Sequence, residues 1–133
     1  MKVGLAIYSI LRNESEITDL VSTRIFPNVA PQTTVFPFII YDVTSDSPTD
    51  TKQGVSELDI NSIMVSCYSE TYTEASEIAE KIRTALDRLP ESTYGTIKIQ
   101  SSEYRGYNDI FDDDSGNNGI YRKAIDFDIR IMN

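Results

Sequence analysis

The stretch TYTEASEIAEKIRTALDRLP, residues 71–90, carries the clearest structural signal in the chain. Its apolar residues recur at helical spacing over about four turns. These residues are Ala75, Ile78, Ala79, Ile82, Ala85, Leu86 and Leu89. Thr71 and Glu74 have the spacing of a capping box at the start, and Pro90 closes the element. The stretch therefore predicts one long helix with an apolar face that must pack against another layer.

Two segments after this helix show the alternation of half-buried strands. In residues 96–103, Ile97 and Ile99 share one face. In residues 119–132, apolar residues alternate with polar or small ones for most of the length. The intervening residues 104–118 are polar and predict a long loop.

Two strands are also predicted before the helix. Residues 38–43 are β-branched or aromatic except for Asp42, and they begin just after Pro37, where a proline removes no ladder bond. Residues 58–68 form the second strand, whose alternation changes phase in the middle, so we expect a bulge near Asn61 and Ser62. The polar residues 44–57 between these strands predict a long loop, which is too long for a tight hairpin turn.

The N-terminal part predicts two short helices and an extended arm. Residues 2–11 have helically spaced apolar positions, and a second helix follows with Asn13 as its expected N-cap and ends before Pro27. Three prolines in residues 26–37 remove backbone donors and favour extended geometry. Residues 26–36 are therefore expected to form an ordered extended arm rather than a central strand.

The order of these elements predicts an α+β fold in a single domain over residues 1–133. We expect a mainly antiparallel sheet of about four strands, with one long helix and two short N-terminal helices packed on one face. The length of 133 residues suits one hydrophobic core.

The charge balance argues against a protein that grips nucleic acid. Twelve basic and 21 acidic residues, with no histidine, give a formal net charge of −9. Phosphate binding needs clustered Lys and Arg, whereas the basic residues here are scattered. An acidic surface can still lie beside DNA without holding it, because like charges repel. No stretch reads as a membrane span, and the N-terminus reads as part of the fold, so the expected place of synthesis is the cytoplasm.

The residues needed for common catalytic sites are missing or badly spaced. The absence of histidine excludes Ser/His/Asp and Cys/His arrangements, and the single Cys67 falls on a strand face, where a buried apolar role is expected. The acidic group Asp109, Asp112, Asp113 and Asp114 fails the spacing of a calcium-binding loop. A solvated acidic loop is the preferred interpretation, with Ca²⁺ or Mg²⁺ binding as the lesser alternative. No metal site or cofactor is predicted.

Three segments together resemble a known family. They are RIFPNVAP at residues 24–31, FPFIIYDV at 36–43 and ETYTEASEIAEKIRTALD at 70–87. In their order and spacing they are similar to the small tail-completion or tail-terminator proteins of long-tailed bacteriophages and prophages, which join the head to the tail. The resemblance covers residues 1–90 well and the remainder by element order only.

The resemblance implies a structural protein of the virion, without a cofactor. It would form a sixfold homo-oligomeric ring at the head-proximal end of the tail tube, end tube polymerisation, and join the tail to the head connector or stopper protein. Its partners would be other copies of itself, the major tail tube protein and the connector, and DNA would pass through without specific binding. A closed ring needs two different surface patches that meet head to tail.

Two sets of residues are candidates for these contacts. The arm is expected to pack on the neighbouring subunit through Arg24, Phe26, Pro27, Pro31, Phe36 and Pro37, although an arm that packs only on its own sheet is equally open. The two long loops are expected to face the tube or the connector through Asp46, Asp50, Lys52, Tyr107, Asp112, Asp113 and Asp114.

Two other functions stay open. One is a non-catalytic α+β module that binds a protein partner in the cytoplasm. The other, less favoured, is a metal-dependent hydrolase that uses the acidic loop around Asp112.

Overall fold

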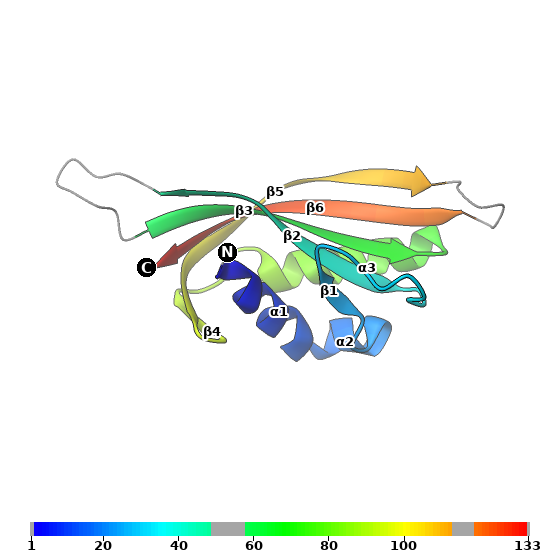
Figure 1. Cartoon of the computed structure of the whole chain (residues 1–133), viewed down its shortest axis with the longest axis horizontal. Helices are drawn as coiled ribbons and strands as arrows, with labels where there is room; N and C mark the ends of the chain where they lie inside the picture. Colours follow the sequence, from blue (N-terminus) through cyan, green and yellow to red (C-terminus); the bar gives the residue numbers. More distant parts are fainter. Residues whose placement is uncertain (1, 49–57, 113–118, 133) are drawn as a thin grey trace.

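The part of the chain that the structure describes forms one curved sheet with three helices on one of its faces (Figure 1). The structure is a computed structural model, and it describes residues 2–48, 58–112 and 119–132. No helix of these described segments lies on the other face of the sheet, as expected for an antiparallel sheet with one solvated side.

The sheet has six strands among the described residues, in the order β1-β2-β3-β6-β5-β4. The strands are β1 (Ile25–Pro27), β2 (Phe38–Pro48), β3 (Leu58–Ser69), β4 (Ser92–Tyr94), β5 (Ile97–Asp112) and β6 (Ile120–Met132). All neighbours are antiparallel except β1 and β2, which are parallel. The predicted α+β class is confirmed, but the expected four-stranded antiparallel sheet is wrong in detail. It missed the two three-residue strands at the edges, which are too short to show a period.

The helices are α1 (Val3–Asn13), α2 (Ser15–Val21) and α3 (Tyr72–Leu86). The β2–β3 pair extends beyond the helix layer at one end of the molecule, and the β5–β6 pair ends at the opposite end, above the start of α3 (Figure 1). The cap of α3 is half of a capping box: the Glu74 N–H donates to Thr71 Oγ1 at 3.3 Å, while the Glu74 carboxylate accepts from Ser69 Oγ. The predicted cap of α2 is wrong. Asn13 is the last residue of α1, and the N-cap of α2 is Glu14, which makes no side-chain capping bond.

The predicted loop at residues 104–118 is wrong over its first nine positions, because β5 continues to Asp112. Two register shifts interrupt β5, between Ile99 and Ser101 and between Tyr104 and Gly106. Each extra residue reverses the side-chain alternation that identifies a strand in a sequence. The strand therefore reads as irregular although it pairs with β6 over its length.

The predicted loop at residues 44–57 is also wrong at its start, because β2 continues to Pro48. The bulge expected in β3 lies instead in β2, where the register with β3 shifts between Val43 and Ser45. The pairing of β3 with β6 is uninterrupted. The change of phase in β3 is therefore not caused by a bulge in β3. It instead places the polar Asn61 on the helix-facing side, where Asn61 is fully buried and its side-chain amide makes no hydrogen bond.

The core lies between the helices and the inner face of the sheet. Fully buried side chains come from every layer, including Ile7 and Leu11 of α1, Leu86 of α3 and Phe127 of β6. Burying a side chain of this size stabilises a fold by roughly 1.5–3 kcal/mol. The core thus fixes the inner face of the sheet and leaves its two edges and its outer face for contacts.

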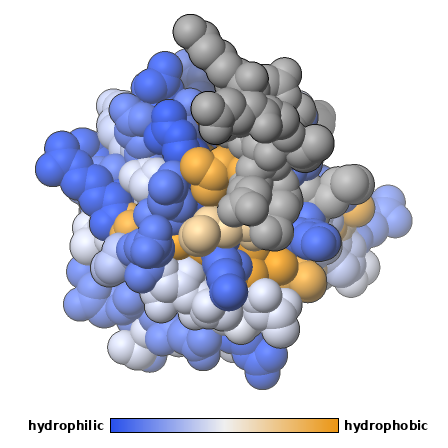
Figure 2. All heavy atoms as spheres, turned by 90° about the vertical axis from the view of Figure 1, so that its left-hand side faces the viewer, coloured by the Kyte–Doolittle hydropathy of each residue, from blue (hydrophilic) through white to orange (hydrophobic). Residues whose placement is uncertain are grey.

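The end of the molecule at which β2 and β6 finish is mostly hydrophilic. Figure 2 looks at this end and shows a small apolar group near the centre of a largely hydrophilic surface. Met132, the last residue of β6, is 38% exposed. An apolar group of this size is ordinary on the surface of a folded domain.

Candidate functional site

Part of the proline-rich arm is bound to its own chain. Arg24 Nε donates to the Pro37 carbonyl at 2.8 Å, and the Ile39 N–H donates to the Arg24 carbonyl at 2.9 Å. The ring of Phe36 lies 5.2 Å from that of Phe38. Three of the predicted interface residues, Arg24, Phe36 and Pro37, therefore have a role within the subunit, beside the edge of the sheet.

Other arm residues face outward. Val29 is 73% exposed and Val35 is 62% exposed, and Pro27 and Pro31 are exposed as well. Phe26 is half-buried in β1. The arm thus offers an apolar outer surface at the β1 edge of the sheet, formed by the predicted residues Pro27 and Pro31 together with Val29 and Val35, which were not predicted.

The residues predicted to face the tube or the connector lie on two strands and beyond them. Asp46 lies on β2, whereas Tyr107 and Asp112 lie on β5 at the opposite end of the molecule (Figure 1). Asp50, Lys52, Asp113 and Asp114 lie outside the described residues. The structure therefore separates the two predicted loop surfaces by the length of the sheet.

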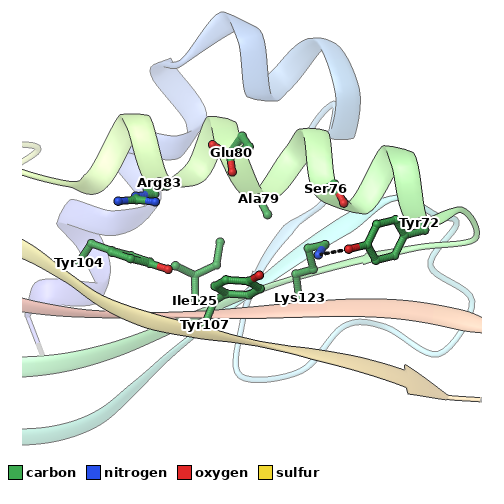
Figure 3. Close-up of a pocket in the computed structure, with 9 residues that line it drawn as sticks. All are labelled: Tyr72, Ser76, Ala79, Glu80, Arg83, Tyr104, Tyr107, Lys123 and Ile125. Atoms are coloured by element: carbon green, nitrogen blue, oxygen red, sulfur yellow. Dashed lines mark hydrogen bonds between the residues drawn. The ribbon is translucent and has the colours of Figure 1, made fainter.

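A pocket that was not predicted from the sequence lies between α3 and the helix-facing side of β5 and β6. This pocket has a volume of about 210 Å³, and residues of α3, β5 and β6 line it (Figure 3). It is smaller than the roughly 300–1,000 Å³ typical of pockets for small molecules. Its size suits one side chain better than a substrate.

A buried lysine lies at one end of the pocket. Lys123 is 6% exposed, and its Nζ donates to Asp109 Oδ1 at 2.5 Å and to the Tyr72 hydroxyl at 3.4 Å. The ammonium also lies over the rings of Tyr72 and Tyr107, 4.4 and 5.4 Å from their centroids (Figure 3). Such contacts compensate a buried cation for the water it has lost.

These contacts keep Lys123 charged. Burial lowers the pKa of Lys123, but the hydrogen bonds to Asp109 and Tyr72 and the charge of Asp109 outweigh burial, so the pKa lies above its usual value. A lysine that acts as a general base needs a pKa lowered towards neutrality. The geometry thus favours a structural or binding role for Lys123 over proton transfer.

Aromatic side chains continue from the pocket towards the tip of the β5–β6 pair. Tyr72, Tyr107 and Phe111 are 52%, 55% and 52% exposed, and Ile110 is 39% exposed. The Tyr121 ring lies 4.9 Å from Phe111 and 5.8 Å from Tyr72. We call Tyr72, Tyr107 and Phe111, which lie on the helix side of the sheet, the aromatic shelf, whereas Ile110 lies on the other face of β5. Exposed aromatics beside a desolvated cation have the composition of protein interfaces.

The outer face of the sheet carries charges of both signs. Arg105 contacts Glu103 and Asp128 at 3.6 and 3.5 Å, and Arg122 donates to Ser66 Oγ and lies over the ring of Tyr68. These arginines are thus occupied within the chain. Neither arginine is therefore free to pair with a phosphate without giving up a contact within the chain.

Cys67 is buried on the inner face of β3, near the end of the strand, and the predicted burial is confirmed. It is 0% exposed and its Sγ donates to the Ala75 carbonyl at 3.4 Å. Burial raises the pKa of the thiol from 9.0 to about 12, so it is protonated and a poor nucleophile at neutral pH.

This thiol makes the fold sensitive to alkaline pH. A pKa raised in the folded state adds stability that is complete below the usual value and is lost as pH rises above it. We expect the free energy of unfolding to fall by up to roughly 1.4 kcal/mol per pH unit once pH exceeds 9.0. The pKa values of Tyr41 and Tyr68 are also raised by burial, from 10.0, so the thiol gives the larger part of the loss between pH 9 and 10 and the tyrosines add more above pH 10. Denaturant unfolding at both pH values measures the loss.

Replacement of the thiol provides the control. Cys67→Ala should lower stability at neutral pH because it leaves a small cavity, but it should reduce the loss between pH 9 and 10 to the smaller part that Tyr41 and Tyr68 contribute. The same loss in the variant would mean that another group titrates in this window.

Comparisons with known proteins agree with the sequence resemblance. The family model of tail completion protein gp17 matches residues 5–132. A solved chain in the virion of a native gene transfer agent particle is similar with a TM-score of 0.76 at 14% identity, over 96% of this chain and 92% of that one. A second solved structure matches with a TM-score of 0.51 at 10% identity over 92% of each chain. No curated protein matches at a significant level. No helix among the described residues is long and apolar enough to cross a membrane. The family match covers nearly the whole chain, so the protein belongs to the tail completion protein gp17 family and is a structural component of the phage tail.

Proposed function

We propose that copies of the protein form a closed sixfold ring at the head-proximal end of the phage tail tube. The ring ends polymerisation of the major tube protein and joins the tail to the connector of the head. The observation that carries this proposal is the family match over residues 5–132. The likeness to a chain of a gene transfer agent virion, over 96% of this chain, supports it.

The arrangement of the surface fits assembly better than catalysis. The pocket is small and holds a charged lysine rather than a base, and the exposed apolar residues lie on the arm and on the aromatic shelf. These two surfaces belong to opposite edges of the sheet, because the arm follows β1 and the shelf includes β5. A ring needs such a pair of different surfaces, one on each side of the subunit.

The passage of DNA through the ring fits the charge of the chain. The net charge of −9 disfavours adhesion of phosphates, and the arginines Arg105 and Arg122 on the outer face of the sheet have partners within the chain. DNA can therefore move through without being held.

The ring predicts a fixed, low number of copies in each particle. Quantitative mass spectrometry of purified particles should give a low constant ratio of this chain to the major tube protein, consistent with a single ring. Absence of the chain from mature particles, or a ratio that grows with tail length, contradicts the proposal.

The outer surface of the arm should matter for assembly and not for folding. Because Val29 and Val35 are largely exposed, Val29→Asp with Val35→Asp should change the free energy of unfolding by less than about 0.5 kcal/mol for each substitution. At a subunit contact the new carboxylates would be buried, and burying an unpaired charge costs free energy. We therefore expect that the variant forms no rings, which native mass spectrometry can detect.

A matched control is Thr84→Asp, on the exposed side of α3, which should leave assembly intact. If the arm variant forms rings as well as the wild type does, the arm packs only on its own sheet and makes no subunit contact.

A further inference from the structure

The two edges of the sheet are each covered over only part of their length. On β5, the strand β4 pairs with Ile97 to Ile99. The turn after α3 covers the next stretch, where the Arg88 N–H donates to the Ser102 carbonyl and the Tyr104 N–H donates to Asp87 Oδ1. From Gly106 to Phe111, no described strand pairs with the outer side of β5. We call Gly106–Phe111 the open half of β5.

The opposite edge shows the same pattern. The strand β1 pairs with Ile39 to Tyr41 of β2, and the Asn28 N–H adds a bond to the Tyr41 carbonyl. Beyond this point, from Val43 onward, no described strand pairs with the outer side of β2. Each edge thus has one protected half and one half that can accept a strand.

The directions of the strands make these two halves compatible. The strands β2, β3, β6 and β5 are neighbours in this order and alternate in direction, so β5 and β2 run opposite to each other. Suppose that a second copy lies beside the first and that the helices of both copies are on the same face of the combined sheet. The β2 of the second copy then runs antiparallel to the β5 of the first. This contact is heterologous and can therefore repeat around a ring.

The positions of the two halves also fit. The open half of β5 lies at one end of the long axis, at the β5–β6 tip, and the outer part of β2 lies at the other end (Figure 1). A copy shifted along the strands brings one beside the other, and neither β4 nor β1 takes part in this strand pairing.

The side chains around the open half of β5 favour an occupied edge. Tyr107, Ile110 and Phe111 are all exposed there, the stretch contains no proline or lysine, and its one charged residue, Asp109, is paired with Lys123. Monomeric proteins protect such edges with charges, prolines or covering segments, because an exposed apolar edge recruits other strands. An added strand would satisfy the backbone groups and cover part of the aromatic shelf.

We infer that the open half of β5 in one copy pairs with the outer edge of β2, from Val43 onward, in the next copy. The pairing is antiparallel and extends the sheet from subunit to subunit. The inference rests on the proposed ring and specifies which surfaces meet in it.

Disulfide cross-linking of the full-length protein tests this pairing. The cysteines are placed on the face of the sheet away from the helices. On β5 this face carries Asn108 and Ile110, which pair with Ala124 and Arg122 of β6. On β2 it carries Ser45, which pairs with Ser62 of β3, and Ser47. All four are exposed. Each double variant combines Asn108→Cys or Ile110→Cys with Ser45→Cys or Ser47→Cys, which samples the possible registers. Cys67 is buried and does not interfere.

After mild oxidation, at least one double variant should give a ladder of bands at multiples of 15.0 kDa. A mixture of the two corresponding single variants should give heterodimers only. Lys98→Cys, exposed on the half of β5 that β4 covers, replaces the β5 cysteine as the control and should give no ladder. Thermal melting of each reduced variant checks that it folds.

The outcomes separate the pairing from the ring itself. Dimers formed by Asn108→Cys alone would mean that β5 pairs with another β5 and would overturn the inference. Rings seen by native mass spectrometry without a ladder from any of the four pairs would overturn it as well, while the proposed ring would stand. A ladder together with open chains and no closed species would support the pairing and contradict the ring.

Discussion

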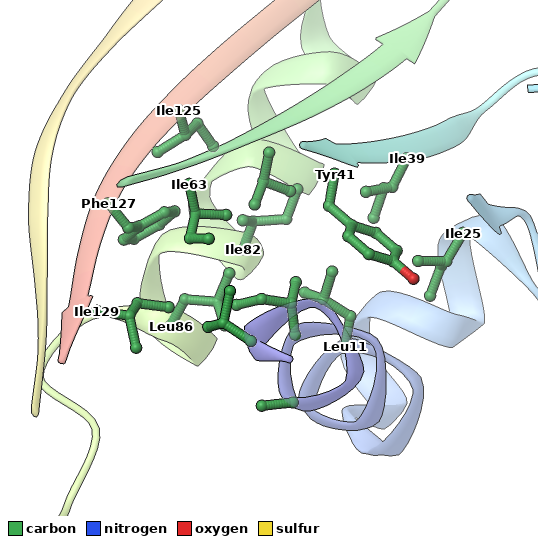
Figure 4. Packing of buried hydrophobic residues seen from close by; sticks show 14 of the residues in the cluster. Leu11, Ile25, Ile39, Tyr41, Ile63, Ile82, Leu86, Ile125, Phe127 and Ile129 are labelled. Carbon is green, nitrogen blue, oxygen red and sulfur yellow. The ribbon is translucent and has the colours of Figure 1, made fainter. Parts of the chain in front are cut away.

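Phe127→Ala should lower the free energy of unfolding by about 3–5 kcal/mol, the largest effect we expect from one substitution. Phe127 is 0% exposed at the middle of β6, opposite Ile63 of β3, and its ring meets the edge of Tyr104 with centroids 6.1 Å apart. Figure 4 shows it on the inner face of the sheet, among the aliphatic side chains of the core. Its removal leaves a cavity that strands held on both sides cannot close. Denaturant unfolding at one fixed protein concentration measures the loss.

The matched control removes an apolar side chain from the surface. Val35→Ala, at a position that is 62% exposed, should change stability by less than about 0.5 kcal/mol. Since domains of this size are stable by roughly 5–15 kcal/mol, Phe127→Ala should leave a folded but fragile protein. Similar losses from both variants would show that Phe127 does not pack in the core as described.

The parts of the fold that could be predicted have a regular period. In α3, the apolar positions and the pair of Thr71 and Glu74 fixed both the type of element and its start. In β6, Ile125, Phe127, Ile129 and Ile131 alternate without a break, and all four are buried. One face of each element packs against the core, so burial imposes its period directly on the sequence.

The parts that could not be predicted lack this constraint or interrupt it. In β5, Tyr104 and Tyr107 face the same side although they are three residues apart, because the register shifts between Tyr104 and Gly106. The last residues of β2, which include Ser45 and Ser47, lie on a strand pair that extends beyond the helices, so neither face needs apolar residues. Such segments are strands because their backbones pair, and the sequence does not record that pairing.

The pocket was missed for the same reason. Lys123 lies two residues before Ile125, so the alternation of β6 already places it on the helix-facing side. That position was the one available signal of a buried lysine. Its partner Asp109 was assigned to a loop, and the ion pair could not be recognised until β5 was known to continue beside β6.

Asp109→Asn should lower the free energy of unfolding by about 1.5–3 kcal/mol at neutral pH, although Asp109 itself is partly exposed. The substitution leaves the buried ammonium of Lys123 with the Tyr72 hydroxyl and two ring faces but no counter-charge. An unpaired buried charge costs more than the pair contributed, so the loss should reflect desolvation of Lys123. Denaturant unfolding of the monomeric protein measures it, with Glu16→Gln as control. That control breaks the exposed pair of Glu16 and Lys81 and should cost less than about 0.5 kcal/mol.

The double variant decides whether Lys123 is the cause. Lys123→Met removes the charge and keeps most of the side-chain volume, so adding it to Asp109→Asn should restore most of the lost stability. A double variant as unstable as Asp109→Asn would mean that Asp109 acts through another contact. If stability recovers while rings or their cross-links weaken, the buried cation serves the subunit contact beside the aromatic shelf rather than the fold. The charge of Lys123 would then be needed for binding the neighbouring subunit, which covers the exposed tyrosines above it, and not for folding.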